Sequence, residues 1–498
     1  KQGNLNMRMK TLSAAVLAGL GVAGTAQAVH VNPDGLGQVL LNPYYTVQNG
    51  FDTYLHVVNT SSTEVKAVKV RFLEGKNSRE VLDFNLYLSP NDEWTGAITR
   101  TEAGAGVTSD DTSCIAPSQL PALGSAPQEF RNFEYVGDSV NGTDRTREGY
   151  VEIIEMGVVT NNILVGGVDL AAAATHPQTG PSPVPVPPDC NAIRNAASQG
   201  GALNDNPTDL VTLPTGGLYG FTTLINVGAG VKASIDAITL DNFFTNPFTV
   251  NADLHTSPGS LLPSLNEVNT DAAVLDGNQI ITSTWTREPV DTVSMVLMHD
   301  QIMNDYEVDI ERLSRTDWVV TFPTKRFYVN SGQDLAARAP FTELWSPELS
   351  ASCDPIAVTY WDREEQQEQF QDDFSPRPPE GGTSLCNEVN TLSVQPNGAP
   401  SDYATLFGAQ FTAAGFDLAP NFQEGWMRID FDGPNAQFFG QDPLTSELQL
   451  YSGLPVIGVA AINNVNNILE IEGVTVLSNY MGSTVHKATR DIQIVAPQ

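Results

Sequence analysis

The most regular pattern along the chain is an alternation of apolar and polar positions between residues 35 and 160. In VKAVKVRFLEG, Val68, Val70 and Phe72 fall on one side of an extended chain, and Lys69 and Arg71 fall on the other. Similar runs, separated by turn residues, are REVLDFNLYLSP, DTYLHVVNTS and GYVEIIEMGVV. Because side chains of a strand point alternately to opposite faces, these segments predict half-buried β-strands.

Short strands between turn residues, with few helical patterns, predict a mostly β chain built from two immunoglobulin-like β-sandwich regions. HPQTGPSPVPVPPDC is dense in proline, which favours an extended linker. We therefore expect an N-terminal β-sandwich domain over residues 29–175, a proline-rich linker over 176–190 and a C-terminal β-rich domain over 191–498.

Short helices are expected to be inserted in the second region. Asp189 precedes CNAIRNAASQ and is a residue type that caps helices. The segment DTVSMVLMHDQIMNDY, residues 291–306, begins with a possible cap, Asp291. It then repeats apolar side chains at helical spacing: Val293, Val296, Leu297 and Ile302. This pattern predicts one longer helix among the strands.

The first residues have the pattern of a secretory signal peptide. Arg8 and Lys10 precede an apolar run from Leu12 to Ala23, and Ala26-Gln27-Ala28 follows as a cleavage site. The run is too short to span a bilayer. We expect residues 1–28 to be removed and the mature chain, without a membrane span, to be periplasmic, on the outer surface or extracellular.

The formal charge is −33, or −36 without the basic residues Lys1, Arg8 and Lys10 of the expected signal peptide. Such a charge argues against binding to nucleic acid or to an anionic membrane, and it makes cations the natural counterparts. Four cysteines in an exported chain favour disulfides over a metal site. Of the three possible pairings, the local one is favoured: Cys114 with Cys190, and Cys353 with Cys386.

An acidic segment, WDREEQQEQFQDDFSP at 361–376, lies between Cys353 and Cys386. Asp362 and Glu365 fit a capping box, so a short helix could begin there, with Glu364 and Glu368 one turn apart. Carboxylates so placed suit a calcium site or an acid/base pair that cleaves glycosides. A solvated acidic loop is the simpler interpretation.

A second candidate for calcium is DFDGPN, which contains Asp430 and Asp432 and resembles the start of a calcium-binding loop. The twelfth position of that loop would be Gln441 where an EF-hand needs a glutamate, so the complete motif is not present. An ordinary Asp-Gly turn explains the segment as well. No cofactor other than calcium is indicated.

Basic residues gather in one place, between residues 66 and 79, against the acidic background. They could form a surface that docks on the acidic face of another copy or on an anionic polysaccharide. Lysines that protect an edge strand from unwanted pairing are the simpler interpretation. The five residues are Lys66, Lys69, Arg71, Lys76 and Arg79.

Several phrases are similar to recurrent stretches of a group of exported proteins of Gram-negative bacteria whose function is not established. The phrases are AVKVRFLEGKNSREVLDFNLYLSPNDEWTGAI, GGLYGFTTLINV, TDWVVTFPTKRFYV and GLPVIGVAAINN. The resemblance extends from about Gly35 to Arg490 and implies a bacterial, exported, β-rich protein. It implies no catalytic residue.

No G-x-S-x-G, S-x-x-K or H-E-x-x-H motif occurs, and the histidines, including His299, lack metal-ligand spacing. We therefore expect a disulfide-stabilised protein that acts by binding or assembly outside the cytoplasm, through self-assembly or a surface glycan. The alternatives are a secreted carbohydrate-active hydrolase that uses the loop carboxylates, and a glycan- or solute-binding module. Its exposed aromatics would include Trp94, Trp318, Trp361 and Trp426.

Overall fold

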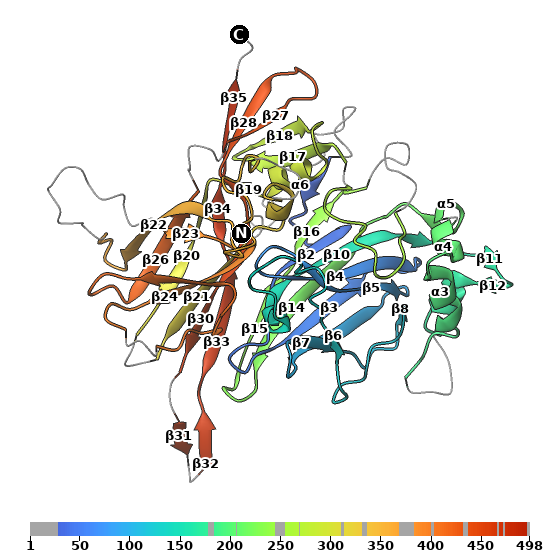
Figure 1. Cartoon of the computed structure of the whole chain (residues 1–498), viewed down its shortest axis with the longest axis horizontal. Helices are drawn as coiled ribbons and strands as arrows, with labels where there is room; N and C mark the ends of the chain where they lie inside the picture. Colours follow the sequence, from blue (N-terminus) through green and yellow to red (C-terminus); the bar gives the residue numbers. More distant parts are fainter. Residues whose placement is uncertain are drawn as a thin grey trace, which may run out of the picture.

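A computed structural model describes most of the chain after residue 27 and shows a protein made largely of β-sheets (Figure 1). The described ranges are 28–177, 184–205, 207–244, 254–267, 269–309, 313–330, 336–367, 383–399, 403–431, 437–465, 468–471 and 474–495. The predicted β-rich fold is confirmed. No helix within these ranges is long and apolar enough to span a membrane.

Two sheets form the first half of the molecule, which we call the first sheet pair. One sheet has the order β1-β16-β2-β10-β4-β5-β8, with β13 paired to β10. Its strands are β1 (His30–Val31), β2 (Val39–Thr46), β4 (Lys66–Glu74), β5 (Glu80–Leu88), β8 (Cys114–Ala116), β10 (Glu148–Val159), β13 (Val211–Thr212) and β16 (Ile238–Asp241).

The other sheet of the pair has the order β15-β14-β3-β6-β7-β9. Its strands are β3 (Asp52–Asn59), β6 (Glu93–Arg100), β7 (Ala105–Thr108), β9 (Gln128–Glu129), β14 (Leu218–Asn226) and β15 (Val231–Asp236). Apolar side chains from both sheets, such as Leu55, Val70, Trp94 and Ile153, form one hydrophobic core between them. The alternation seen in the sequence therefore directs one face of each strand into this core.

The proline-rich segment does not separate two sheet systems, so the expected boundary at 176–190 is misplaced. Strands that follow it complete the first sheet pair: β14 pairs with β3 from Leu218 to Ile225, and β16 pairs with β2. A proline-rich segment cannot pair as a strand within a sheet, because proline lacks the backbone N–H. The strands before and after such a segment can still belong to the same sheets and the same core.

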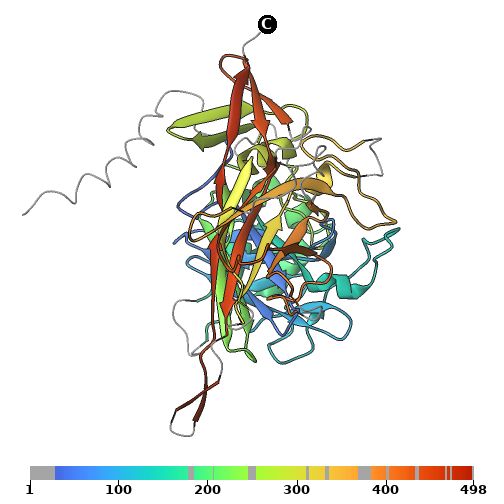
Figure 2. The same cartoon turned by 90° about the vertical axis from the view of Figure 1, so that its left-hand side faces the viewer.

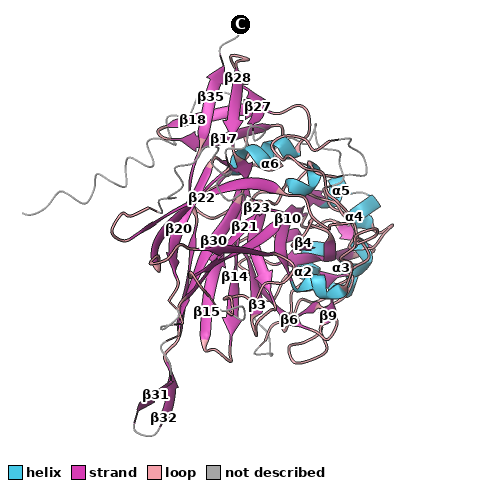
Figure 3. Cartoon of the chain, turned by 60° about the vertical axis from the view of Figure 1, so that its left-hand side comes forward, coloured by secondary structure: helices cyan, strands magenta, loops and turns pink. Residues whose placement is uncertain are grey.

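Four short helices pack on the first sheet pair, although three of them follow the proline-rich segment as expected (Figure 3). They are α2 (Leu170–Ala174), α3 (Cys190–Ala197), α4 (Ala202–Asp205) and α5 (Pro207–Leu210). The predicted cap is confirmed, because Asp189 Oδ1 accepts a hydrogen bond of 3.0 Å from Ala192 N. A disulfide between Cys114 and Cys190 ties α3 to β8.

Three five-stranded sheets form the second half. The first, β17-β18-β27-β28-β35, contains β17 (Asp271–Asp276), β18 (Gln279–Thr284), β27 (Gln437–Gln441), β28 (Leu448–Ser452) and β35 (Asp491–Val495). The second, β23-β22-β26-β20-β34, contains β20 (Gln301–Glu307), β22 (Asp354–Asp362), β23 (Thr383–Leu385), β26 (Glu424–Asp430) and β34 (Lys487–Thr489). The third, β25-β24-β21-β30-β33, contains β21 (Arg315–Thr321), β24 (Val389–Gln395), β25 (Ala413–Asp417), β30 (Ile457–Asn464) and β33 (Tyr480–Val485).

Small elements complete the described part of the chain. Three two-stranded sheets pair β11 (Leu164–Val165) with β12 (Val168–Asp169), β19 (Met298–His299) with β29 (Leu454–Pro455), and β31 (Ile468–Ile471) with β32 (Val474–Leu477). Two 3-10 helices are η1 (Thr143–Arg147) and η2 (Lys325–Phe327). The second disulfide joins Cys353 and Cys386, so both local pairings expected from the sequence are present.

The helix predicted over 291–306 is only half as long as expected. Helix α6 spans Val290–Leu297, and the chain then enters β19 and β20. In β20, Ile302 and Tyr306 are buried at strand spacing, and every residue of the strand pairs with β26. Sheet pairing therefore overrides the helical spacing in the second half of the segment.

The two halves of the molecule share a continuous apolar contact. Tyr44 and Tyr150 of the first sheet pair lie in one buried cluster with Val319, Val389 and Phe407 of the second half. Thr321 Oγ1 also donates a hydrogen bond of 2.8 Å to the carbonyl of Pro43. This junction positions the cavity described below.

Candidate functional site

The acidic segment after β22 begins as a turn, and the short helix expected at Asp362 is wrong. Asp362 Oδ1 accepts hydrogen bonds from the backbone of Glu364 at 2.9 Å and Gln366 at 2.8 Å, and Glu365 has a φ of 65°. Such a φ interrupts a helix. Glu364 and Glu365 are exposed, which argues against a role in a catalytic cleft. Glu368 lies outside the described residues.

The second calcium candidate does not lie close to the first. Asp430 lies opposite Ala357 on β22, five residues from Asp362 and about 17 Å along the strand, and it pairs with Arg428 at 3.0 Å. Asp432 lies outside the described residues. Within the described ranges, no three His, Cys, Asp or Glu side chains are placed to hold one metal ion. Calcium binding stays a prediction.

The basic residues of β4 are buried, so neither an exposed docking surface nor an edge strand describes them. Strand β4 lies between β10 and β5 in the interior of its sheet. Each basic side chain of the strand has an acidic partner within 2.6–2.7 Å: Lys66 with Glu155, Lys69 with Asp83, and Arg71 with Glu80 and Glu152. The outer face of this sheet is covered by the loop that contains Ser257, whose carbonyl accepts a hydrogen bond from Lys69.

Burial and ion pairing shift the pKa values of Lys69 and Arg71 in opposite directions. Burial lowers the pKa of Lys69, although Asp83 opposes this effect. Burial alone would lower the pKa of Arg71, but Glu152 and Glu80 raise it above its usual value. These pairs therefore stabilise the folded sheet only while both partners are present.

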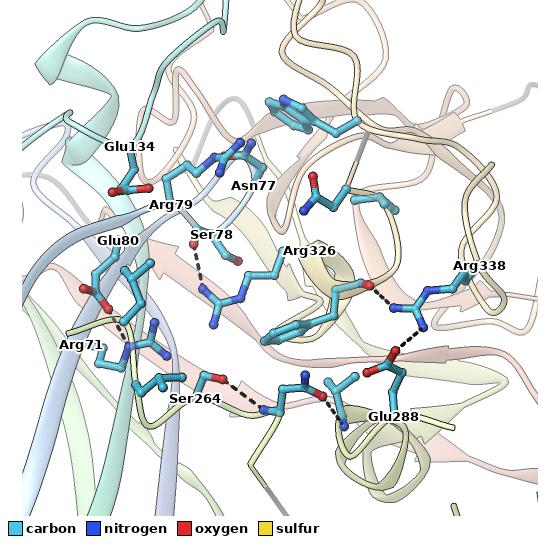
Figure 4. A pocket seen from close by; sticks show the side chains of 18 residues that line it. Arg71, Asn77, Ser78, Arg79, Glu80, Glu134, Ser264, Glu288, Arg326 and Arg338 are labelled. Atoms are coloured by element: carbon cyan, nitrogen blue, oxygen red, sulfur yellow. Dashed lines mark hydrogen bonds and ion pairs between the residues drawn. The ribbon is translucent and has the colours of Figure 1, made fainter. Parts of the chain in front are cut away.

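Lys76 and Arg79 follow β4 at the junction between the two halves. Lys76 Nζ donates a hydrogen bond of 3.1 Å to Asn387 Oδ1 in the second half. Arg79 lines a cavity of about 550 Å³, which we call the junction cavity, together with Arg71, Arg326 and Arg338 (Figure 4). The turn after β4, the 3-10 helix η2 and the following loop supply three of these arginines to one place.

Two of the arginines that line the junction cavity, Arg79 and Arg326, each hold one nitrogen atom enclosed by protein. Arg79 Nε and Arg326 Nε are buried and have no hydrogen-bond partner within the described part of the chain. Arg326 Nη1 donates to the Ser78 carbonyl at 3.1 Å, while its guanidinium lies over the Phe327 ring at 4.6 Å. Figure 4 shows Arg326 between Arg79 on one side and Arg338 on the other. Guanidinium groups that line a cavity can bind a carboxylate or a phosphate.

The rest of the lining of the junction cavity provides hydrogen-bond acceptors and apolar surface. Glu80, Glu134 and Glu288 also line the junction cavity, and Glu288 lies 3.7 Å from Arg338. Phe327 and Trp345 contribute aromatic rings. The lining thus combines cations, acceptors for hydroxyl groups, and ring surfaces, which is the composition of a site for a polar small molecule.

The aromatic residues proposed for glycan binding fall into two groups. Trp94 and Trp318 are fully buried and belong to the cores. Trp361 and Trp426 face each other across β22 and β26, with ring centroids 4.1 Å apart and an interplanar angle of 11°. Because stacked rings cover each other, this pair does not form the side-by-side platform that the binding-module hypothesis requires.

His299 does not form a catalytic arrangement. It lies in β19, and its Nδ1 atom is 3.2 Å from the carbonyl oxygen of Thr489. Burial, assisted by the positive charge of Arg490, lowers the pKa of His299 to about 3. The imidazole is therefore neutral over the physiological range.

Sequence analysis identified Arg71 and Arg79 as part of a basic cluster but did not identify the junction cavity. Arg326 and Arg338 lie about 250 residues further along the chain, in segments without a binding motif. Only the packing of the two halves brings the four arginines together. The one feature of the sequence that singles out these arginines is the scarcity of basic residues in so acidic a chain.

Comparison with known proteins gives no further indication. No protein-family model, no curated protein and no solved structure matches the chain. The junction cavity must therefore be interpreted from its own chemistry.

Proposed function

We propose that the protein is an exported binding protein whose junction cavity takes a small anionic, hydroxyl-bearing solute, such as a uronic acid. The observation that carries the proposal is the gathering of Arg79, Arg326 and Arg338 on the lining of one cavity. A carboxylate on the solute pairs with guanidinium groups, and the glutamates of the lining accept hydrogen bonds from its hydroxyl groups. A volume of about 550 Å³ suits one or two sugar rings.

Export is part of the same proposal. The signal-peptide pattern of residues 1–28 favours it, and the two disulfides are consistent with an oxidising compartment. We also propose that the first sheet pair is an immunoglobulin-like sandwich; the core shared by its two sheets supports this. Binding outside the cytoplasm is then the role of a β scaffold with a cavity lined by residues of both its halves.

The test is calorimetric titration of the protein with galacturonate, galactose and inorganic phosphate. We expect galacturonate to bind at least about 10-fold more tightly than galactose, because a charge-assisted hydrogen bond is worth about 1.5–3 kcal/mol. Arg326→Gln should remove this preference. Arg131→Gln, on an exposed arginine 4.0 Å from Glu129, is the matched control and should leave it unchanged.

Two outcomes would contradict the proposal. Equal affinity for galacturonate and galactose would show that the arginines do not recognise a carboxylate. Absence of binding by all three probes at millimolar concentration would show that the cavity is not a site for small anions. Binding of phosphate alone would retain the anion site and exclude the sugar.

A further inference from the structure

The lining of the junction cavity includes two neighbouring leucines, Leu261 and Leu262. Both lie within residues 254–267, on the connection from β16 of the first sheet pair to β17 of the second half, and we call this segment the connecting loop. The two halves lie beside each other in Figure 1, and in Figure 2 the second half, in yellow to red, lies in front of the first sheet pair. The connecting loop therefore lines the cavity where the chain passes from one half to the other.

Hydrogen bonds on both sides of the two leucines hold the connecting loop. Before them, Gly259 N donates a hydrogen bond of 2.8 Å to Asp83 Oδ2 on β5 of the first sheet pair. After them, Asn266 Oδ1 accepts a hydrogen bond of 3.0 Å from Val290 N at the start of α6. The backbone that carries the leucines is thus fixed to both halves of the molecule.

The side chains of the two leucines keep about half of their surface in contact with water. The exposed fractions are 51% for Leu261 and 48% for Leu262. Figure 4 shows Ser264, which closely follows them in the chain, between Arg71 and Glu288. The cavity therefore combines charged side chains with apolar surface that a bound molecule can remove from water.

We propose that the solute of the junction cavity is a uronic acid that carries an apolar substituent, such as the phenyl ring of an aryl glycoside, and that Leu261 and Leu262 cover this substituent. The inference rests on the function proposed above, because the arginines of the cavity bind the carboxylate of the same solute.

The size and the chemistry of the cavity favour an apolar ring beside the sugar. A volume of about 550 Å³ leaves space for a second ring next to one uronic acid. If that ring were a second sugar, its hydroxyl groups would lose water against the leucines and gain no hydrogen bond there, which is costly. An apolar ring loses no hydrogen bond at the same place and gains from its removal from water.

Calorimetric titration with four probes tests the proposal: the methyl and the phenyl glycosides of galacturonic acid and of galactose. We expect phenyl galacturonide to bind about 10-fold more tightly than methyl galacturonide, because part of the ring leaves water. Leu262→Ser should reduce this phenyl preference to about 3-fold or less, and Leu261→Ser should change it in the same direction. Leu349→Ser is the matched control, because Leu349 is 75% exposed and lies outside the lining, and it should retain the full phenyl preference.

The four probes distinguish failure of this inference from failure of the proposed function. Equal affinity of the wild type for methyl and phenyl galacturonide would overturn the inference, while a preference for galacturonides over galactosides would still support the anion site. A phenyl preference without any preference for galacturonides would contradict the proposed function but retain the apolar position.

The variants test the role of the leucines separately. Unchanged circular dichroism of each variant shows that folding is intact. A phenyl preference that is the same in Leu261→Ser, Leu262→Ser and Leu349→Ser would overturn the assignment of the substituent to the connecting loop.

Discussion

Arg145→Ala removes the cation that holds the turn after β4 in place. Arg145 is fully buried and binds Glu74 through two contacts, Nε to Oε2 at 2.6 Å and Nη2 to Oε1 at 2.7 Å. It also pairs with Asp138 at 2.8 Å and lies 4.2 Å above the Tyr135 ring. The turn fixed by Glu74 supplies Arg79 to the junction cavity. The substitution therefore tests how strongly Arg145 stabilises this turn and, with it, the fold.

The expected loss is large because two carboxylates remain buried without their cation. Removing one partner of a buried, hydrogen-bonded ion pair costs about 3–5 kcal/mol. The lost contact with the Tyr135 ring adds to this cost in the same direction. We expect the free energy of unfolding to fall by about 4 kcal/mol at pH 8.

The pH dependence identifies the cause. Burial alone would raise the pKa of Glu74, but Arg145 holds it below its usual value. A lowered folded-state pKa gives stability that is present above the unfolded pKa and is lost as the pH falls through the folded pKa. Without Arg145, burial raises the pKa of Glu74, and the variant regains stability when this carboxyl takes up a proton. The difference between wild type and variant should therefore shrink from pH 8 to pH 5.

Urea unfolding followed by circular dichroism at pH 8 and pH 5 measures both effects. Arg145→Lys keeps the charge and should lose less stability than Arg145→Ala. Arg131→Ala, on the exposed arginine near Glu129, should change the free energy of unfolding by less than about 0.5 kcal/mol. A loss below about 1 kcal/mol for Arg145→Ala, or the same loss at both pH values, would refute the reasoning.

Two further predictions concern a close backbone approach and a histidine. Gly149→Ala should cost about 3 kcal/mol or more, because a Cβ atom would lie 2.0 Å from the Leu73 carbonyl oxygen. Gly482→Ala, which meets no atom within 4 Å, should be nearly neutral in the same urea titration. Asp92, 3.5 Å away, raises the pKa of His176, so the stability due to this charge is present below the unfolded pKa of about 6.5 and is lost as the pH rises through the folded pKa. Because the neutral imidazole keeps its hydrogen bonds to Ser89 and Thr112, urea titration of His176→Gln should show a larger loss of stability at pH 6 than at pH 9, and an equal loss at both would contradict this assignment.

Strand periodicity could be predicted from the sequence, but the burial of the second face of β4 could not. Val68, Val70 and Phe72 do face the core as the alternation indicated. Lys69 and Arg71 were expected in solvent because they are charged, yet each is buried against an acidic partner. The acidic partners lie in the next strand, in REVLDFN, at Glu80 and Asp83. The sequence did contain one relevant pattern, because the basic side chains of β4 are followed by acidic side chains in the next strand. Their burial depends on the loop that contains Ser257, which covers this face of the sheet.

The junction cavity could not be predicted from the sequence. It depends on contacts between residues about 250 positions apart, which no local pattern encodes.

The distribution of charge sets a condition for the binding proposed at the junction cavity. Five basic residues are buried and paired with carboxylates: Lys66, Lys69, Arg71, Arg145 and Lys325. They therefore do not offset the acidic residues at the surface, and an anionic solute that approaches the cavity meets a long-range repulsion. Moderate salt screens that repulsion beyond about 8–10 Å, but it weakens buried contacts much less. Binding of the anion should thus be favoured in a saline medium, because the contact with the arginines of the cavity is made at short range.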